Sequence, residues 1–183
     1  AAAAATQPEA YRRQETQPGI RVSRFDGTLP ERTALHPTPG RLEALFCLAG
    51  RAQVTLADGR TVPVGGRELL LISGLAQVRE LLAPGRRFSG ILVSVETDAA
   101  QSSLERLGAL LGWQPQEAPT PDALLRRRGG FASVGETPWS DAAFAELEKL
   151  PPDEQGQYCV LKALELLYLL GCRSVRLPQQ AVA

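Results

Sequence analysis

The chain has 183 residues, with 20 basic and 20 acidic side chains and a formal net charge of zero. A chain of this length forms one domain with a sizeable core, and its charge balance disfavours nucleic acid or anionic lipid as a partner of this fragment alone. Its apolar runs are shorter than the roughly 20 residues that span a bilayer, and its three cysteines are odd in number and far apart. We therefore expect a cytoplasmic protein with reduced thiols and no membrane contact.

The first part of the chain is polar and carries few anchoring residues. We expect residues 1–19 to form a flexible N-terminal arm, and we leave the alanine repeat of residues 1–5 out of the fold prediction. Residues 20–25 alternate as a first strand would. Two prolines in residues 35–40 then predict an extended linker, because a residue that precedes proline is disfavoured in the helical region.

Residues 40–96 carry short apolar runs separated by turn signals at regular intervals. Asp58-Gly59 and Pro84-Gly85 suit tight turns, and Gly50 is expected to end the first run. The predicted strands are residues 42–48, 54–56, 61–64, 67–72, 77–82 and 88–95. Together with the first strand, they predict an antiparallel β-barrel of jelly-roll type at residues 20–96, followed by C-terminal helices, so that the fold is mainly β with α.

The apolar period changes to that of helices in residues 97–177. Leu104, Leu107 and Leu111 mark a helix packed on the barrel, which Thr97 or Asp98 can cap and Gly112 can end.

Two more helices are expected before the last one. Residues 123–128 form a short helix that Gly129-Gly130 ends, and its three arginines are interpreted as a solvated face. Thr137-Pro138 then offers a cap and a proline at the first helical position, and this helix ends at Leu150 before two prolines.

The last predicted helix, at about residues 152–170, is apolar on too many sides for one partner. At 100° per residue, its apolar side chains cover about 220°, whereas a helix buried on one side needs a stripe of about 100°. We infer that the same helix of a second subunit covers the rest. The predicted dimer interface is Val160, Leu161, Leu164, Leu167 and Tyr168. The alternative is that the helix at residues 141–150 covers this face within one subunit.

Two stretches resemble the N-terminal half of AraC-type transcriptional regulators. The first is the set of runs Leu45–Gly50, Val54–Leu56 with Asp58-Gly59, and Val64–Gly66 with Leu69–Ile72, which is similar to their cupin barrel. Val64–Glu68 departs from the pattern, because these domains usually have Pro-Gly-Asp or Pro-Gly-Glu there. The second is Leu161–Leu170, which resembles the Leu-Lys-x-Leu-Glu-Leu-Leu segment of their dimerisation helix.

This resemblance implies an effector-sensing and dimerisation domain. A small-molecule effector would enter the cupin-like barrel, and a homodimer would present DNA-binding domains. Residues 178–183 would be the linker to such a domain, which this chain lacks, so DNA would be contacted only through that absent domain.

Residues that could perform catalysis are scarce. Enzymatic cupins hold a metal with several histidines and a glutamate, whereas His36, in the proline-rich linker, is the single histidine of the chain. We expect no catalytic residues, no metal and no cofactor. Two alternatives remain open: a metal-independent cupin enzyme of isomerase type and an assembly module without a ligand.

The predicted ligand site lies inside the barrel. Its walls would be Phe46, Val54, Leu70 and Phe88, for each of which a plain core role stays open. Its polar contacts would be Arg41, Glu43, Gln53 and Arg79. A shift of one residue in register would turn a polar contact outward.

Overall fold

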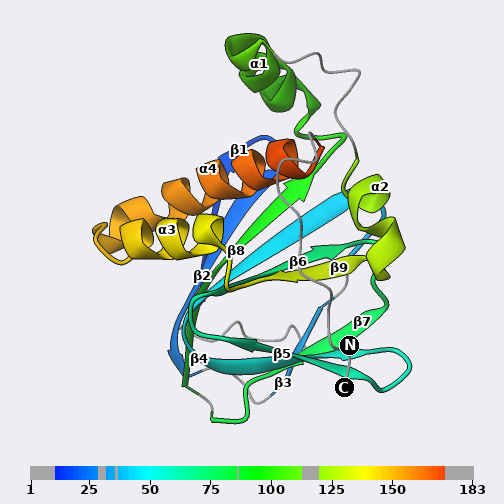
Figure 1. The fold of residues 1–183 in the computed structure, drawn as a ribbon, viewed down its shortest axis with the longest axis vertical. Coiled ribbons are helices and arrows are strands. Elements are labelled where there is room, and N and C mark those ends of the chain that lie inside the picture. Colours follow the sequence, from blue (N-terminus) through cyan, green and yellow to red (C-terminus); the bar gives the residue numbers. More distant parts are fainter. Residues whose placement is uncertain (1–10, 29–31, 36, 86, 113–119, 172–183) are drawn as a thin grey trace, which may run out of the picture.

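The computed structural model describes residues 11–28, 32–35, 37–85, 87–112 and 120–171 (Figure 1). Its strands are β1 Tyr11–Gln17, β2 Ile20–Thr28, β3 Arg32–Ala34, β4 Arg41–Leu56, β5 Thr61–Gly65, β6 Glu68–Ser73, β7 Val78–Leu82, β8 Arg87–Glu96 and β9 Phe131–Val134. Its helices are α1 Gln101–Leu111, α2 Pro121–Leu125, the 3-10 helix η2 Arg126–Arg128, α3 Pro138–Leu147 and α4 Pro152–Gly171.

The long strand β4 joins two antiparallel layers. Its first half pairs with β6 and β8 in the order β1-β2-β8-β4-β6-β9, and its second half pairs with β5 and β7, the latter beside β3. A register shift between Cys47 and Ala49 bends the strand between these halves, and Gly50 there has a φ of +88°. The result is the expected mainly β, cupin-like jelly roll with helices.

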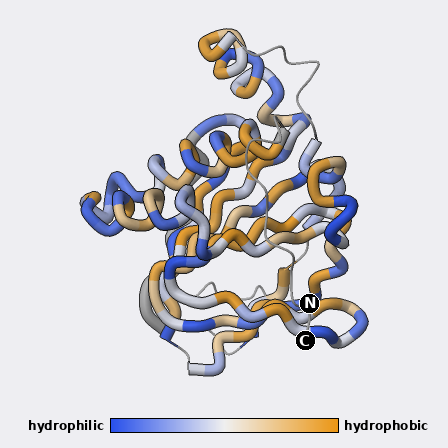
Figure 2. Tube along the Cα trace, in the orientation of Figure 1, coloured by the Kyte–Doolittle hydropathy of each residue, from blue (hydrophilic) through white to orange (hydrophobic). Residues whose placement is uncertain are grey.

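The sheet that contains β8 separates two apolar clusters. The barrel-side cluster lies between the two layers and includes Leu45, Leu70 and Phe88. The helix-side cluster lies on the other face, where Leu42, Phe46 and Val93 pack against α2, α3 and α4, as do Leu125, Phe144 and Ala163 of these helices. Figure 2 shows hydrophobic stretches where the helices meet this sheet. Both faces of the sheet are therefore buried, which explains the continuous apolar run of β6.

Local signals set the helix ends. Thr137 caps α3 in a reciprocal capping box with Ser140, and Pro138 occupies the first turn, as predicted. Gly112 and Gly129 adopt the left-handed conformation after α1 and η2, also as predicted. However, α1 starts after Ala100 without a side-chain cap, so neither Thr97 nor Asp98 serves as its N-cap.

Helices α3 and α4 lie side by side across the sheet, whereas α1 stands away from it (Figure 1). Arg24 of β2 holds the start of α4 by donating to the carbonyl oxygen of Pro152 at 2.9 Å and to Oε1 of Gln155 at 2.8 Å. In α1, by contrast, Leu110 is 82% exposed and Leu111 is 59% exposed. The prediction that α1 packs on the barrel is thus wrong for its C-terminal half.

Three strand predictions need correction. Tyr11–Gln17 is not a flexible arm but strand β1, which pairs with β2, while residues 1–10 and the predicted linker at 178–183 lie outside the described residues. Residues 42–56 are one strand, because the bend at Gly50 changes pairing partners without ending the ladder. Strand β9, Phe131–Val134, has too short an apolar alternation to be predicted and gains its structure from pairing with β6.

Candidate functional site

The predicted wall residues divide between the two clusters. Val54, Leu70 and Phe88 belong to the barrel-side cluster, where each is at most 1% exposed. Phe46 does not line the barrel: it faces the helices, and its ring centroid lies 6.2 Å from that of Phe144. The alternation of β4 places Phe46 with Leu42 and opposite Leu45, so the assignment of Phe46 to the barrel wall was an error of register.

The four predicted polar contacts are not brought together. Gln53 and Arg79 are exposed, so the prediction that they point into the barrel is wrong. Glu43 is buried, at 7% exposure, on the barrel side of β4 and accepts a hydrogen bond from the Ser94 hydroxyl at 3.4 Å. Arg41, on the same side of the strand, forms an ion pair with Glu96.

Arg41 and Glu43 therefore lie in a polar group at the ends of β2, β4 and β8. Arg21 also approaches Glu96, at 3.6 Å, so two guanidinium groups share one carboxylate. These ion pairs are partly exposed and satisfy one another across three strands, which makes them a structural closure of this barrel end.

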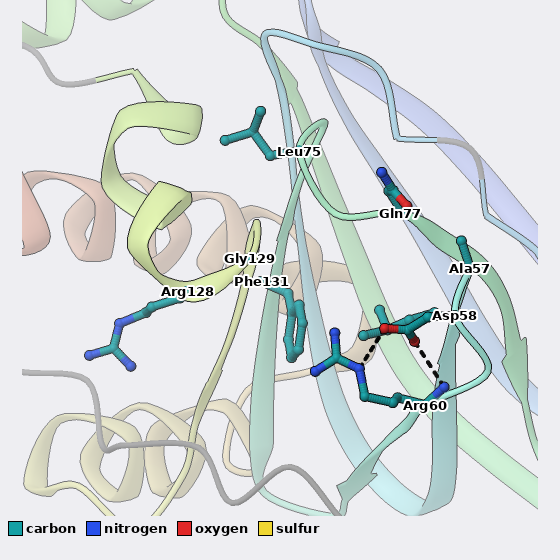
Figure 3. Close-up of a pocket in the computed structure, with 9 residues that line it drawn as sticks. Ala57, Asp58, Arg60, Leu75, Gln77, Arg128, Gly129 and Phe131 are labelled. Atoms are coloured by element: carbon teal, nitrogen blue, oxygen red, sulfur yellow. Dashed lines mark hydrogen bonds and ion pairs between the residues drawn. The ribbon is translucent and has the colours of Figure 1, made fainter.

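A cavity of about 390 Å³ opens near the turn between β4 and β5 (Figure 3). Its lining comes from that turn, the turn between β6 and β7, and the junction of η2 with β9. The lining residues are Leu56, Ala57, Asp58, Arg60, Leu75, Gln77, Arg128, Gly129 and Phe131. Leu56 and Phe131 also belong to the barrel-side cluster, so the floor of this cavity is the edge of the barrel core.

Local backbone geometry brings these three walls together. Asp58 and Gly59 form the predicted turn, in which Gly59 has a φ of +88°. Gly130 also has a positive φ, and a Cβ at this position would collide with the backbone nitrogen of Ala76. The absence of a side chain at Gly130 thus lets its carbonyl oxygen accept a hydrogen bond from Ser73 at 2.7 Å and holds η2 against the turn between β6 and β7.

An ion pair lies at the mouth of the cavity. The Nε of Arg60 donates to Oδ2 of Asp58 at 2.6 Å, and its backbone N–H donates to Oδ1 at 3.0 Å. The backbone and side-chain hydrogen bonds from Arg60 hold the pKa of Asp58 below the ordinary value of 3.8. Asp58 is therefore a carboxylate near neutral pH.

None of the eight predicted ligand residues lines this cavity. The sequence signals that could have found it were the Asp58-Gly59 turn and the basic run of η2, of which Arg128 is half-buried while Arg126 and Arg127 are exposed. Each had been interpreted on its own, as a turn and as a solvated face. Only the tertiary fold shows that they border one cavity.

The five predicted dimer residues lie together on one flank of α4. Relative to Cys159 in the buried stripe, 100° steps place them between about 80° and 200° around the helix. Helix α3 lies on a different flank, at about 260° to 300°, where the Lys162 ammonium lies 5.9 Å from the centroid of the Trp139 ring. On the predicted flank, Leu161 is 56% exposed and Val160, Leu164, Leu167 and Tyr168 are half-buried.

The described residues with potential for nucleophilic or metal chemistry are buried or scattered. Burial raises the pKa of Cys47 to about 12 and raises that of Cys159 further, so both thiols are protonated near neutral pH. Within the described ranges, no three His, Cys, Asp or Glu side chains are grouped to hold a metal ion, and His36 lies outside those ranges. In the same part of the chain, no helix is long and apolar enough to cross a membrane.

Comparison with solved structures supports the fold. ToxT from Vibrio cholerae matches with a TM-score of 0.50 at 11% identity, over 88% of this chain and 56% of the ToxT chain. A cupin protein from Bacteroides fragilis gives a TM-score of 0.37 at 16% identity, over 51% of this chain and 81% of that chain. Protein NMB1881 from Neisseria meningitidis gives 0.39 at 17% identity, over 51% and 90%. This chain thus spans little more than half of ToxT.

Sequence comparison identifies the family. Curated protein sequences give no significant match. The family model of the regulatory protein PchR N-terminal domain, however, matches residues 6–147, which is most of the chain. With the ToxT-like fold, this match confirms the expected N-terminal domain of an AraC-type regulator. The chain therefore belongs to the PchR N-terminal domain family of regulatory proteins.

Proposed function

We propose that this chain is the effector-sensing and dimerisation domain of an AraC-type transcriptional regulator, and that it has no catalytic activity of its own. The family match over residues 6–147 carries this proposal. DNA is contacted by a separate domain of the regulator, in keeping with the zero net charge of this one.

The effector is a small molecule that binds in the cavity between the turn after β4 and η2. The middle of the barrel is filled by the barrel-side cluster, whereas this cavity, of about 390 Å³, is within the size range of small-molecule sites. Its floor residues Leu56 and Phe131 are part of the barrel core, so a bound ligand would contact the scaffold as well as the turns.

Helix α2 offers a route from this cavity to α4. Arg128 of η2 lines the cavity, and α2, which directly precedes η2, contacts α4. Leu125, at the end of α2, is buried in the helix-side cluster together with Ala163 of α4. An effector that binds one arrangement of η2 more tightly than another would therefore change the packing of α2 against the dimerisation helix.

Dimerisation uses the flank of α4 that faces away from α3. The position of α3 on the Lys162 flank supports a second subunit, rather than α3, as the partner of Leu161 and Leu164.

Effector sensing is tested by calorimetric titration of the whole chain with a panel of metabolites, followed by the same titration after mutation of cavity residues. Saturable binding that cavity mutations weaken is the expected result. A stoichiometric bound transition metal in the purified protein, with turnover of a substrate, would replace the regulatory proposal with an enzymatic one.

Dimerisation is tested by sedimentation velocity of the Leu164→Asp variant. A carboxylate at this half-buried position should convert dimers to monomers, because it would be desolvated in the interface. Ala142→Asp adds the same charge to an exposed position of α3 and should leave the dimer intact. An unchanged mass for the Leu164→Asp variant would count against the interface.

A further inference from the structure

Positive charge prevails among the side chains that line the cavity. Arg60 and Arg128 contribute two guanidinium groups, and Asp58 contributes the single carboxylate of the lining. Arg126 and Arg127, both exposed, add positive charge on the same turn of η2. The cavity therefore has an excess of positive charge although the whole chain is neutral.

Arg60 has donors left for a ligand. Asp58 occupies its Nε and its backbone N–H. Its two terminal guanidinium nitrogens make no hydrogen bond or ion pair with any described residue. Figure 3 shows these nitrogens directed toward the side of the cavity that carries Phe131, away from Asp58. Two such donors in a planar fork match the two oxygens of a carboxylate.

The rest of the lining is largely apolar. Leu56 and Phe131 form a buried floor, each 5% exposed, and Leu75 at the rim is 41% exposed. A ligand that fits these surroundings has an apolar body and one anionic end.

We infer that the cavity binds a small organic carboxylate, with the carboxylate on the terminal nitrogens of Arg60 and the apolar body between Phe131 and Leu75. This assignment of ligand class rests on the proposed effector-sensing function. Asp58 holds the guanidinium in place through Nε, and its negative charge weakens the binding of a second carboxylate to the same arginine.

The probe is 3-phenylpropanoate, with 3-phenylpropanamide as a neutral control of the same size. Each is titrated into the whole chain, and binding is followed by amide chemical shifts in nitrogen-15 NMR spectra. We expect the acid, and not the amide, to shift the amide signals of Gly59, Arg60 and Gly129. Equal binding of acid and amide, shifts confined to other regions, or no shifts up to the solubility limit of the acid would each overturn the inference.

Charge variants then test the role of each side chain. Arg60→Gln should weaken binding of the acid by about tenfold or more, because a charge-assisted pair is lost. Arg60→Lys should lie between this variant and the natural protein, because it keeps the charge without the fork. Asp58→Asn should strengthen binding by roughly threefold, because asparagine still accepts from Nε but removes the repulsion.

Arg127→Gln is the matched control. It removes the same charge from an exposed neighbouring position that does not line the cavity, and it should change the affinity by less than about twofold. Equal losses for Arg60→Gln and Arg127→Gln would reduce the effect to a general field and overturn the assignment. Binding of neutral metabolites alone in the calorimetric panel would leave effector sensing standing while defeating the carboxylate class.

Discussion

The two faces of the sheet around β8 are both buried, but by different means. On the barrel side, the cluster is built from strands and their turns, and the second halves of β4 and β5 close over it. On the helix side, the cluster depends on α2, α3 and α4, which reach the sheet after long excursions of the chain. Strands that pair with one another close a core by themselves, whereas packed helices cover it only as far as their apolar stripes extend.

This difference leaves apolar surface on one side only. Leu166 of α4 is fully buried at 0% exposure, yet Leu161 of the same helix is 56% exposed. The barrel side has its opening at the cavity, where charged groups border the apolar floor. The comparison suggests a division of labour, in which the barrel side binds the effector and the helix side binds a second subunit.

The largest expected effects come from removing one aromatic ring on each face. Phe88 packs edge to face with Phe25 at 6.3 Å on the barrel side, and Phe144 packs with Phe46 on the helix side; each is 1% exposed. Phe88→Ala and Phe144→Ala should each lower the free energy of unfolding by about 3–5 kcal/mol, measured by urea denaturation. A loss below about 1 kcal/mol for Phe144→Ala would show that the helix layer is not a true core.

The next prediction compares two leucines of α4. Leu166→Ala should lower the free energy of unfolding by about 2–5 kcal/mol, because it leaves a cavity in the helix-side cluster. Leu161→Ala should change it by less than about 0.5 kcal/mol at concentrations where the protein is monomeric. Denaturation at several protein concentrations separates folding from association. Equal losses for both variants in the monomer would mean that the chain itself covers the outer flank.

A smaller effect is expected at the start of α3. Thr137 accepts from the backbone N–H of Ser140 at 3.1 Å, and Ser140 accepts from that of Thr137 at 3.1 Å. Thr137→Ala should lower the free energy of unfolding by about 1 kcal/mol, again by urea denaturation. Thr137→Ser keeps the hydroxyl acceptor and should recover most of this loss. Similar losses for both variants would exclude the capping box as their cause.

The smallest expected effect is the pH dependence that arises from Asp58. Because hydrogen bonds from Arg60 depress the pKa of Asp58 in the folded state, its contribution to stability is present above the ordinary pKa of 3.8 and is lost as the pH falls through the folded value. Asp58→Asn should remove this part of the acid dependence of the melting temperature, with little change near neutral pH. Parallel acid profiles for the natural chain and this variant would contradict the prediction.

Local patterns were sufficient for elements whose signals lie within a few residues. Alternation and turn residues predicted β5, β6, β7 and β8, because each run has its own turn signals. Thr137-Pro138 predicted the start of α3, because the cap and the proline satisfy the first turn locally. The stripe of α4 was also visible in the sequence, because helical spacing orders side chains without reference to their partners.

The sequence by itself determined the sheet-and-helix plan, the family and the excess of apolar surface on α4. Only the tertiary structure decided that β4 continues through Gly50, that Phe46 faces the helices, and that Arg60 and Arg128 border one cavity. The physical reason is the range of each interaction: turns and caps are made between neighbours in the chain, whereas a cavity is made by segments about 70 residues apart that meet only when strands pair and a residue without a side chain, Gly130, lets a helix turn approach.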